Sequence, residues 1–111
     1  MFVVEDMPAG GVGGGEFHRN RSEIIATMRG RVRWICEDLY GSTRVFEPSR
    51  ESVLHIPPFI LHTMESEEDG SSIVVIANTL FDPGDARTQD SHSAAQFREL
   101  QQQMRMRPKG A

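Results

Sequence analysis

Short runs of apolar and β-branched residues, each ended by glycine, proline or a polar turn, follow one another along most of the chain. This pattern predicts β-strands, and we expect them at residues 2–4, 22–28, 31–37, 43–46, 52–56, 62–64 and 72–77. No internal repeat of about 20–50 residues accompanies them, which argues against a solenoid or propeller. Short strands at this spacing are typical of an all-β sandwich or barrel.

Two of these runs carry more specific expectations. Residues 22–28 and 31–37 flank Arg29-Gly30, which predicts a β-hairpin. The first run is apolar on both faces, since Ile24, Ala26 and Met28 alternate with Ile25. Both faces therefore favour burial, and the short first strand would leave a sheet edge exposed, so we predict a homodimer.

The pattern changes after Asn78, where residues 80–85 read as a loop and a helix follows. Ser93 is a suitable N-cap, Gln96 completes a capping box, and an apolar stripe follows at Phe97, Leu100 and Met104. We therefore expect a β-barrel over residues 1–90, a helix packed on or beside it at 91–106, and a disordered tail at 107–111.

Length, charge and cysteine content narrow the class of protein. The chain has 111 residues, enough for one small domain, and a net charge of -4 that provides no basic footprint for nucleic acid. Cys36 is the only cysteine, so no internal disulfide framework exists. No apolar run reaches about 18 residues and no export segment is visible. We expect a soluble cytoplasmic protein without a nucleic-acid or membrane partner.

The glycine-rich run GGVGGG at residues 10–15 does not fit a phosphate-binding loop. Such a loop needs a helix whose N-terminus faces the anion, but β-type sequence follows here. We interpret the run as a flexible turn, or as a place where the backbone approaches a ligand closely.

Four side chains able to bind a metal or transfer a proton follow this run, and the last of them lies after the Pro57-Pro58 turn. Glu16 and His18 are two residues apart, so on an extended strand they point to the same face. Glu23 begins the next strand and His62 lies far downstream. The alternative is that both glutamates are solvated charges and both histidines hydrogen-bonded wall residues.

The spacing of these residues resembles the two cupin motifs. Glu16-Phe17-His18, four residues, Glu23, six residues and Gly30 resemble the first motif, in which HxH, a glutamate and a closing glycine occur. Residues 56–62, IPPFILH, resemble the second motif, P-x-G-x-x-H, with Phe59 where glycine is usual. The resemblance implies a single small cupin, a double-stranded β-helix or jelly-roll barrel, followed by a C-terminal α-helix.

Within the cupins, the chain looks most similar to those acting on nucleotide-linked sugars. Residues 14–19, GGEFHR, echo the GGHAHR of WxcM-like 3,4-ketoisomerases. Residues 78–83, NTLFDP, echo the N-E-x-FDP of the C-terminal cupin in capsular-polysaccharide sugar-nucleotide enzymes. This resemblance implies an isomerase or epimerase of a nucleotide-linked keto-deoxysugar in polysaccharide or glycoside biosynthesis. Glu16 and His18 would be its catalytic residues, although glutamate replaces the first histidine of HxH.

The same pattern implies a ligand set for a divalent metal, formed by Glu16, His18, Glu23 and His62. Two imidazoles and two carboxylates suit zinc, iron, manganese or nickel. A metal-dependent cupin of another class, such as a small-molecule dioxygenase or isomerase, and a non-catalytic ligand-binding cupin are the alternatives.

Other residues carry weaker expectations. Arg31 and Arg33 are candidates for binding the phosphates of a nucleotide-sugar, with a solvated strand face as the alternative. Trp34 and Cys36 are expected in the core. His55 is expected to be structural or exposed, and His92 to lie on the surface.

Overall fold

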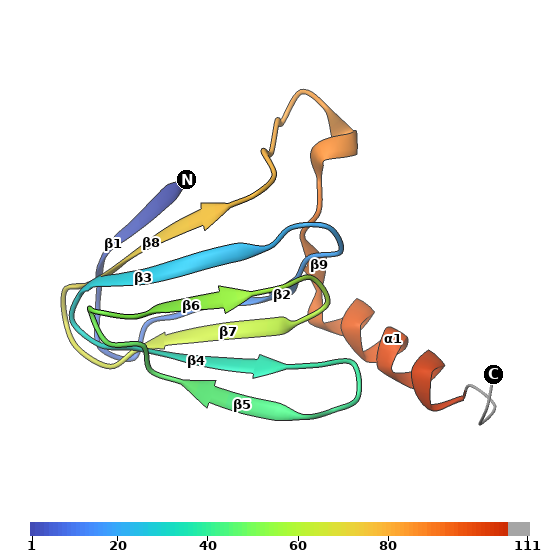
Figure 1. The fold of residues 1–111 in the computed structure, drawn as a ribbon, viewed down its shortest axis with the longest axis horizontal. Coiled ribbons are helices and arrows are strands. Elements are labelled where there is room, and N and C mark those ends of the chain that lie inside the picture. Colours follow the sequence, from blue (N-terminus) through green and yellow to red (C-terminus); the bar gives the residue numbers. More distant parts are fainter. Residues whose placement is uncertain (107–111) are drawn as a thin grey trace.

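A computed structural model describes residues 1–106, which form two antiparallel sheets followed by one α-helix (Figure 1). The four-stranded sheet has the order β1 (Phe2–Met7), β8 (Ser71–Ala77), β3 (Glu23–Arg29), β6 (Val53–Ile56). The five-stranded sheet has the order β5 (Thr43–Phe46), β4 (Val32–Glu37), β7 (Leu61–Ser66), β2 (Val12–Phe17), β9 (His92–Ser93). The predicted mostly-β chain with a C-terminal helix is confirmed.

Strands that follow one another in sequence mostly lie in different sheets. This makes the predicted hairpin across Arg29-Gly30 wrong, because β3 pairs with β6 and β8 whereas β4 pairs with β5 and β7. The inward apolar faces of the two strands pack against each other across the sandwich rather than side by side. Gly30, at φ 74°, turns the chain from one sheet to the other, and a Cβ there would lie on the Ser71 side chain.

The main core fills the space between the sheets. Alternate residues of β3 and β4 point inward, as the period of a strand requires, and Trp34 and Cys36 are buried there as expected. The buried apolar residues of this core are Met7, Ile25, Val32, Trp34, Cys36, Leu54, Ile56, Ile73 and Val75.

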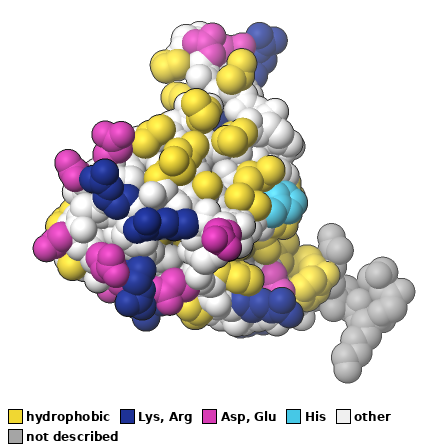
Figure 2. Space-filling model, turned by 60° about the vertical axis from the view of Figure 1, so that its left-hand side comes forward, with side chains coloured by type: hydrophobic (Ala, Val, Ile, Leu, Met, Phe, Trp, Pro, Cys, Tyr) yellow, Lys and Arg dark blue, Asp and Glu magenta, His cyan; other side chains and the backbone are white. Residues whose placement is uncertain are grey.

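The outer face of the four-stranded sheet is also apolar, and residues 1–106 leave it uncovered. Ile24 and Ile76 are paired neighbours on it, and His55 is the neighbour of Ile24 on the other side. Exposed apolar side chains of this sheet include Val3, Ile24, Met28, Val53 and Ile76. Figure 2 shows hydrophobic side chains gathered over one face of the molecule, bordered by arginine and acidic side chains.

The glycine-rich run forms most of strand β2 and is not the turn that the sequence suggested. Gly14 adopts φ 82°, and a Cβ on it would lie 2.7 Å from the carbonyl oxygen of His62 on β7. The pairing of β2 with β7 shifts register between Gly14 and Glu16. The close approach is therefore to a neighbouring strand, and it brings Glu16 beside His62.

Helix α1 (Ala94–Arg105) begins where the capping signal predicted. Ser93 is the N-cap, and its capping box with Gln96 is complete. Phe97 is fully buried, with its ring 5.1 Å from that of Phe17 on β2. A short 3₁₀-helix, η1 (Ala86–Thr88), precedes α1 in the chain.

The predicted disordered tail, 107–111, lies outside the described residues. Among residues 1–106, no helix has the length and apolar character needed to cross a membrane.

Candidate active site

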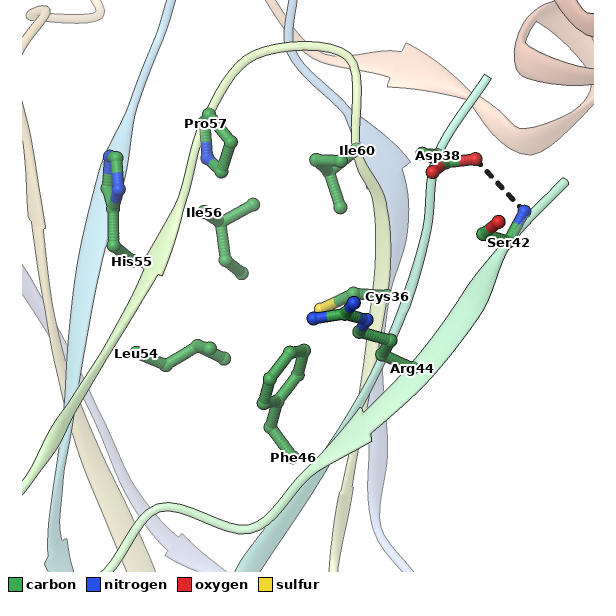
Figure 3. Close-up of a pocket in the computed structure, with 10 residues that line it drawn as sticks. All are labelled: Cys36, Asp38, Ser42, Arg44, Phe46, Leu54, His55, Ile56, Pro57 and Ile60. Atoms are coloured by element: carbon green, nitrogen blue, oxygen red, sulfur yellow. Dashed lines mark hydrogen bonds between the residues drawn. The ribbon is translucent and has the colours of Figure 1, made fainter. Parts of the chain in front are cut away.

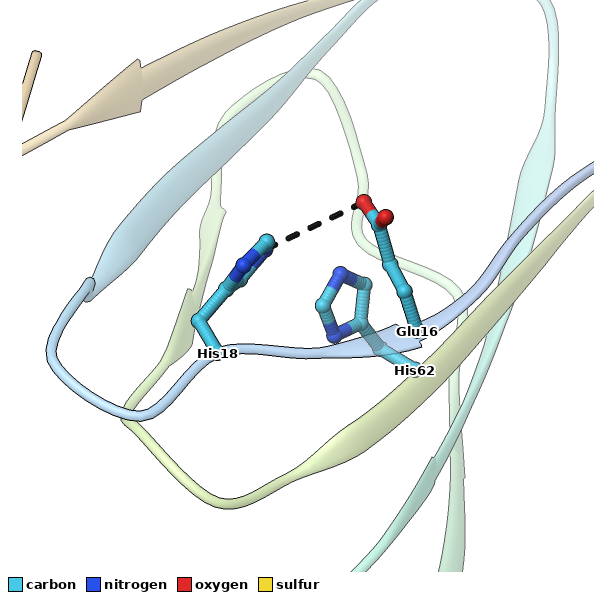
Figure 4. Close-up of side chains that lie close together, drawn as sticks. All are labelled: Glu16, His18 and His62. Atoms are coloured by element: carbon cyan, nitrogen blue, oxygen red, sulfur yellow. Dashed lines mark ion pairs between the residues drawn. The ribbon is translucent and has the colours of Figure 1, made fainter. Parts of the chain in front are cut away.

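The four residues singled out by the two motifs meet between the sheets. Glu16 lies near the end of β2, His18 directly after it, Glu23 at the start of β3 and His62 at the start of β7. Figure 4 shows Glu16, His18 and His62 turned toward one another. The side chains of His18, Glu23 and His62 are 3–5% exposed, whereas that of Glu16 is 41% exposed. Three side chains of the cluster are therefore buried, and the fourth, that of Glu16, reaches solvent.

Glu23 links the two histidines. Its Oε1 atom lies 3.3 Å from Nε2 of His18 and 3.5 Å from Nε2 of His62. Glu16 Oε1 lies 3.9 Å from the same Nε2 atom of His18. Both imidazole rings thus present Nε2 to a carboxylate.

The other ring nitrogen of each histidine is held by a backbone carbonyl. Nδ1 of His18 lies 2.8 Å from the carbonyl oxygen of Asp90, and Nδ1 of His62 lies 3.1 Å from that of Ile60. A carbonyl only accepts, so each Nδ1 must carry the hydrogen. When the rings are neutral, both Nε2 atoms then have a free lone pair, and Nε2 of His18 has no hydrogen-bond partner within the described residues.

Burial and the neighbouring charges shift the pKa values in different directions. Burial lowers the pKa of His18, but the Glu23 carboxylate, the Asp90 carbonyl and the Glu16 charge together outweigh it, so this pKa lies above 6.5. For His62, burial prevails and its pKa is lowered. Burial raises the pKa of Glu23, but the two histidines outweigh it and this pKa is lowered. Compared with free side chains, these shifts favour the charged forms of Glu23 and His18 and the neutral form of His62.

A cavity of about 110 Å³ opens beside the cluster. It lies between the two sheets, on the side where β1 and β2 run. Glu16, Glu23 and His62 contribute its polar wall, and Trp34 and Phe2 are among its apolar residues. Glu16 is the most exposed polar member, so its carboxylate is the group best placed to meet a molecule entering this cavity.

Phe59 occupies the glycine position of the second motif and retains a glycine-like backbone. Its φ is 62°, a left-handed conformation that costs a non-glycine residue about 1–2 kcal/mol. Its N–H donates to the carbonyl oxygen of His18 at 2.7 Å, and its ring lies 6.3 Å from that of Phe17. These contacts offset the strain and tie the loop before His62 to the end of β2.

Arg31 and Arg33, predicted to bind substrate, lie apart from this cluster. Arg33 alternates with Trp34 and so faces away from the cavity. The guanidinium group of Arg33 pairs with Glu65 at 2.6 Å, and that of Arg31 pairs with Glu47 at 3.0 Å and with Glu67 at 3.1 Å. Their predicted role stays a prediction, and these ion pairs give it no support.

Asp90 belongs to the site, although no sequence signal pointed to it. It is a single aspartate in a polar stretch, without a periodic or motif neighbour. Its importance comes from contacts with residues about 70 positions earlier, namely His18, Arg19, Asn20 and Arg21. His92, expected on the surface, is partly buried and lies 3.2 Å from the Asp90 carboxylate.

A second cavity, of about 160 Å³, lies on the opposite side of the sandwich between β5 and β6 (Figure 3). Its walls are mainly apolar, and Arg44 extends into it beside Cys36. Burial raises the pKa of the Cys36 thiol to about 11, so this thiol is not an activated nucleophile. Asp38 and His55 also line this cavity, whereas the histidine–carboxylate cluster lies beside the first one.

The cluster also fits a divalent metal. Donor atoms of Glu16, His18 and His62 all lie within 4.8 Å of one another. At ligand distances of about 2.0–2.2 Å, neighbouring ligands of a tetrahedral ion are about 3.3–3.6 Å apart, close to the two distances from Glu23 to the histidines. Carbonyls that hold Nδ1 are the usual outer partners of metal-binding histidines.

The two sheets and their interior histidine–carboxylate cluster define a small β domain with a polar site between its sheets. The family model described as "FdtA: WxcM-like, C-terminal" matches residues 1–97, and the chain belongs to this family. The family resemblance drawn from the sequence motifs is thereby confirmed. No match was found among curated proteins.

Several solved structures share the fold at low sequence identity. One is a variant of the 3,4-ketoisomerase QdtA from Thermoanaerobacterium thermosaccharolyticum in complex with TDP-4-keto-6-deoxyglucose, with TM-score 0.78, 15% identity, and 96% of this chain and 74% of that chain covered. Another is the TDP-fucose-3,4-ketoisomerase WlaRA from Campylobacter jejuni, with TM-score 0.73, 18% identity, and coverage of 90% and 71%. A third is the capsular polysaccharide assembling protein CapF from Staphylococcus aureus, with TM-score 0.71, 19% identity, and coverage of 82% and 25%. This chain thus corresponds to about a quarter of CapF.

Proposed function

We propose that this chain is a sugar-nucleotide isomerase that moves a carbonyl between neighbouring carbons of a TDP-linked keto-deoxysugar. The observation that carries the proposal is the carboxylate of Glu16, half-exposed in a cavity and 3.9 Å from a buried histidine. The family assignment and the ketoisomerases that share its fold support it.

We also propose that the two sheets form the jelly-roll barrel of the cupins. The supporting observation is the alternation of strands between sheets, since β1, β3, β6 and β8 form one and β2, β4, β5 and β7 belong to the other. Such alternation places the end of β2 and the start of β7 next to the start of β3, as the cluster requires.

In the proposed reaction, Glu16 removes the proton from the carbon beside the ketone. The C–H electron pair forms a carbon–carbon double bond, and the carbonyl oxygen takes up the negative charge. The neighbouring hydroxyl proton then passes to that oxygen, and protonated Glu16 returns its proton to the former carbonyl carbon, which leaves the ketone one position along. His18 lies close to Glu16 and exchanges the proton with it, and its protonated form stabilises the developing oxyanion.

The test uses TDP-4-keto-6-deoxyglucose in deuterium oxide. Proton NMR should show exchange at the carbon beside the ketone and formation of the 3-keto isomer, and the ligand should raise the melting temperature of the protein. The Glu16→Gln protein should bind the ligand without exchange. If the parent protein shows no stabilisation by the ligand and no exchange, the proposal is wrong.

The free Nε2 atoms favour a second candidate, a metal-dependent cupin of another class. Glu16, His18, Glu23 and His62 would hold zinc, iron, manganese or nickel, and the ion would act as a Lewis acid toward a bound oxygen. Elemental analysis of the purified protein tests this. Metal retained by the parent and the His55→Ala control, but lost from His62→Ala, would support the second candidate, whereas equal content in all three proteins would contradict it.

We further propose that the protein is a homodimer whose interface uses the outer face of the four-stranded sheet. The exposed Ile24, Val53 and Ile76 of this face support the proposal, since apolar sheet faces are usually covered. Sedimentation should show a dimer at micromolar concentration, and Ile24→Glu should shift it to monomer. A monomeric parent would contradict it.

A further inference from the structure

Asp90 holds the turn that leads from His18 to β3. The residue is 7% exposed, and its carboxylate accepts the backbone N–H groups of Arg19 at 2.8 Å and of Asn20 and Arg21 at 2.9 Å. Burial raises the pKa of Asp90, but these three N–H groups and His92 outweigh it, so the pKa lies below its ordinary value. The carboxylate is therefore anionic, and its hydrogen bonds are charge-assisted.

The main chain of the same residue holds the His18 ring. The carbonyl oxygen of Asp90 lies 2.8 Å from Nδ1, which fixes both the plane of the ring and the position of its hydrogen. The opposite atom, Nε2, is the one that faces Glu23 and Glu16. If the carbonyl of residue 90 moved away, the Nε2–H tautomer would become available and the ring would be free to turn.

We propose that Asp90 is a positioning residue that sets the tautomer and orientation of His18. Its carboxylate is anchored to three consecutive amides of the turn, and this anchor places its own carbonyl on Nδ1. The other side-chain hydrogen bonds of segment 89–91 are local, since they run between Gln89 and Ser91 and between Asp90 and His92. The inference deepens the proposed isomerase, because it names the group that keeps Nε2 of His18 available for proton exchange.

The direct test is the ¹⁵N NMR spectrum of the His18 ring, recorded at about pH 9 where the imidazole is neutral. The parent should show the hydrogen on Nδ1. Asp90→Ala removes all three anchors and should give a mixture of both tautomers. Asp90→Asn retains one acceptor oxygen and should fall between the two.

Asp85→Ala is the matched control. Asp85 also caps a turn, in the stretch just before segment 89–91. It accepts the N–H of Arg87 and pairs with its guanidinium group, and its hydrogen bonds do not involve His18. This variant should leave the tautomer of His18 unchanged. Comparing the two variants separates loss of the anchor at His18 from general loosening of the segment.

The activity arm measures kcat and KM separately. Asp90→Ala should lower kcat by about 10–100-fold, as removal of other histidine-orienting partners does, with KM little changed and partial recovery in Asp90→Asn. An unchanged Nδ1–H tautomer in folded Asp90→Ala would overturn the inference. If Asp90→Ala does not fold, an unchanged Nδ1–H tautomer in Asp90→Asn would overturn the inference instead. The NMR result does not require a substrate, so it holds or fails independently of the isomerase proposal.

Discussion

Acidic and basic side chains lie close together both in the interior of this molecule and on its surface, in very different surroundings. In the interior cluster, Glu23 lies 3.3 and 3.5 Å from two histidines, and all three side chains are at most 5% exposed. On the outside, Arg33 and Glu65 lie 2.6 Å apart with side chains about 40% exposed. Water screens the outer pair but not the inner cluster, so only the inner groups have the low-dielectric surroundings that alter proton affinity.

The largest difference between the two regions should appear in activity. Glu16→Gln should lower the rate of the proposed isomerisation by about 10²–10⁴-fold, because it removes the proton acceptor while preserving size. Glu65→Gln should change the rate by less than about twofold, as it alters only the outer pair. Steady-state kinetics with TDP-4-keto-6-deoxyglucose compares them, and equal losses in both variants would remove Glu16 from the mechanism.

The second largest difference between the two regions should appear in the free energy of unfolding. Glu23→Ala leaves two buried histidines without their shared carboxylate and should lower the free energy of unfolding by about 3 kcal/mol. Glu65→Ala breaks an exposed pair and should cost less than about 1 kcal/mol. Urea unfolding of each protein provides the comparison. A Glu23→Ala protein as stable as the parent would mean that the cluster is hydrated and relaxed.

The pH dependence of the interior groups has a definite sign. In metal-free protein, NMR titration should place the pKa of His18 above 6.5 and that of His62 below it. His18 thus contributes stability that is complete below about pH 6.5 and is lost as the pH rises through its folded pKa. Glu23, with its lowered pKa, contributes stability above its unfolded value of 4.5 that is lost as the pH falls through the folded one. Reversed positions of the two histidines would contradict the charge assignment.

Salt should produce the smallest contrast. Arg33→Ala should cost less stability at about 1 M salt than at low ionic strength, because salt weakens the interactions of exposed charges. The effect of Glu23→Ala should persist at high salt. Thermal unfolding of both variants at two salt concentrations measures this, and a salt-independent effect at Arg33 would show that its stem packs against the sheet rather than acting through charge.

The sequence was sufficient for features that depend on local spacing. Alternation located the strands other than the glycine-rich β2 and the two-residue β9. The capping box placed the start of α1 at Ser93, and two motifs identified four residues that do converge. It failed where a neighbour is distant in sequence. The partner strand of β3 depends on packing across the sandwich, which local alternation cannot distinguish from a hairpin. The glutamates that pair with Arg31 and Arg33 are likewise distant in sequence, so local spacing did not reveal these ion pairs.

The link between His18 and Asp90 also sets an order for folding. The two residues are 72 positions apart, and β1 likewise needs β8 as its partner. A contact of this range closes a long loop, so it forms late and slows folding. During synthesis, at about 5–20 residues per second, β2 and β3 leave the ribosome seconds before residue 90. The nascent chain therefore carries a His18 whose ring is not yet held, and the site acquires its working geometry only after the strands around it have formed.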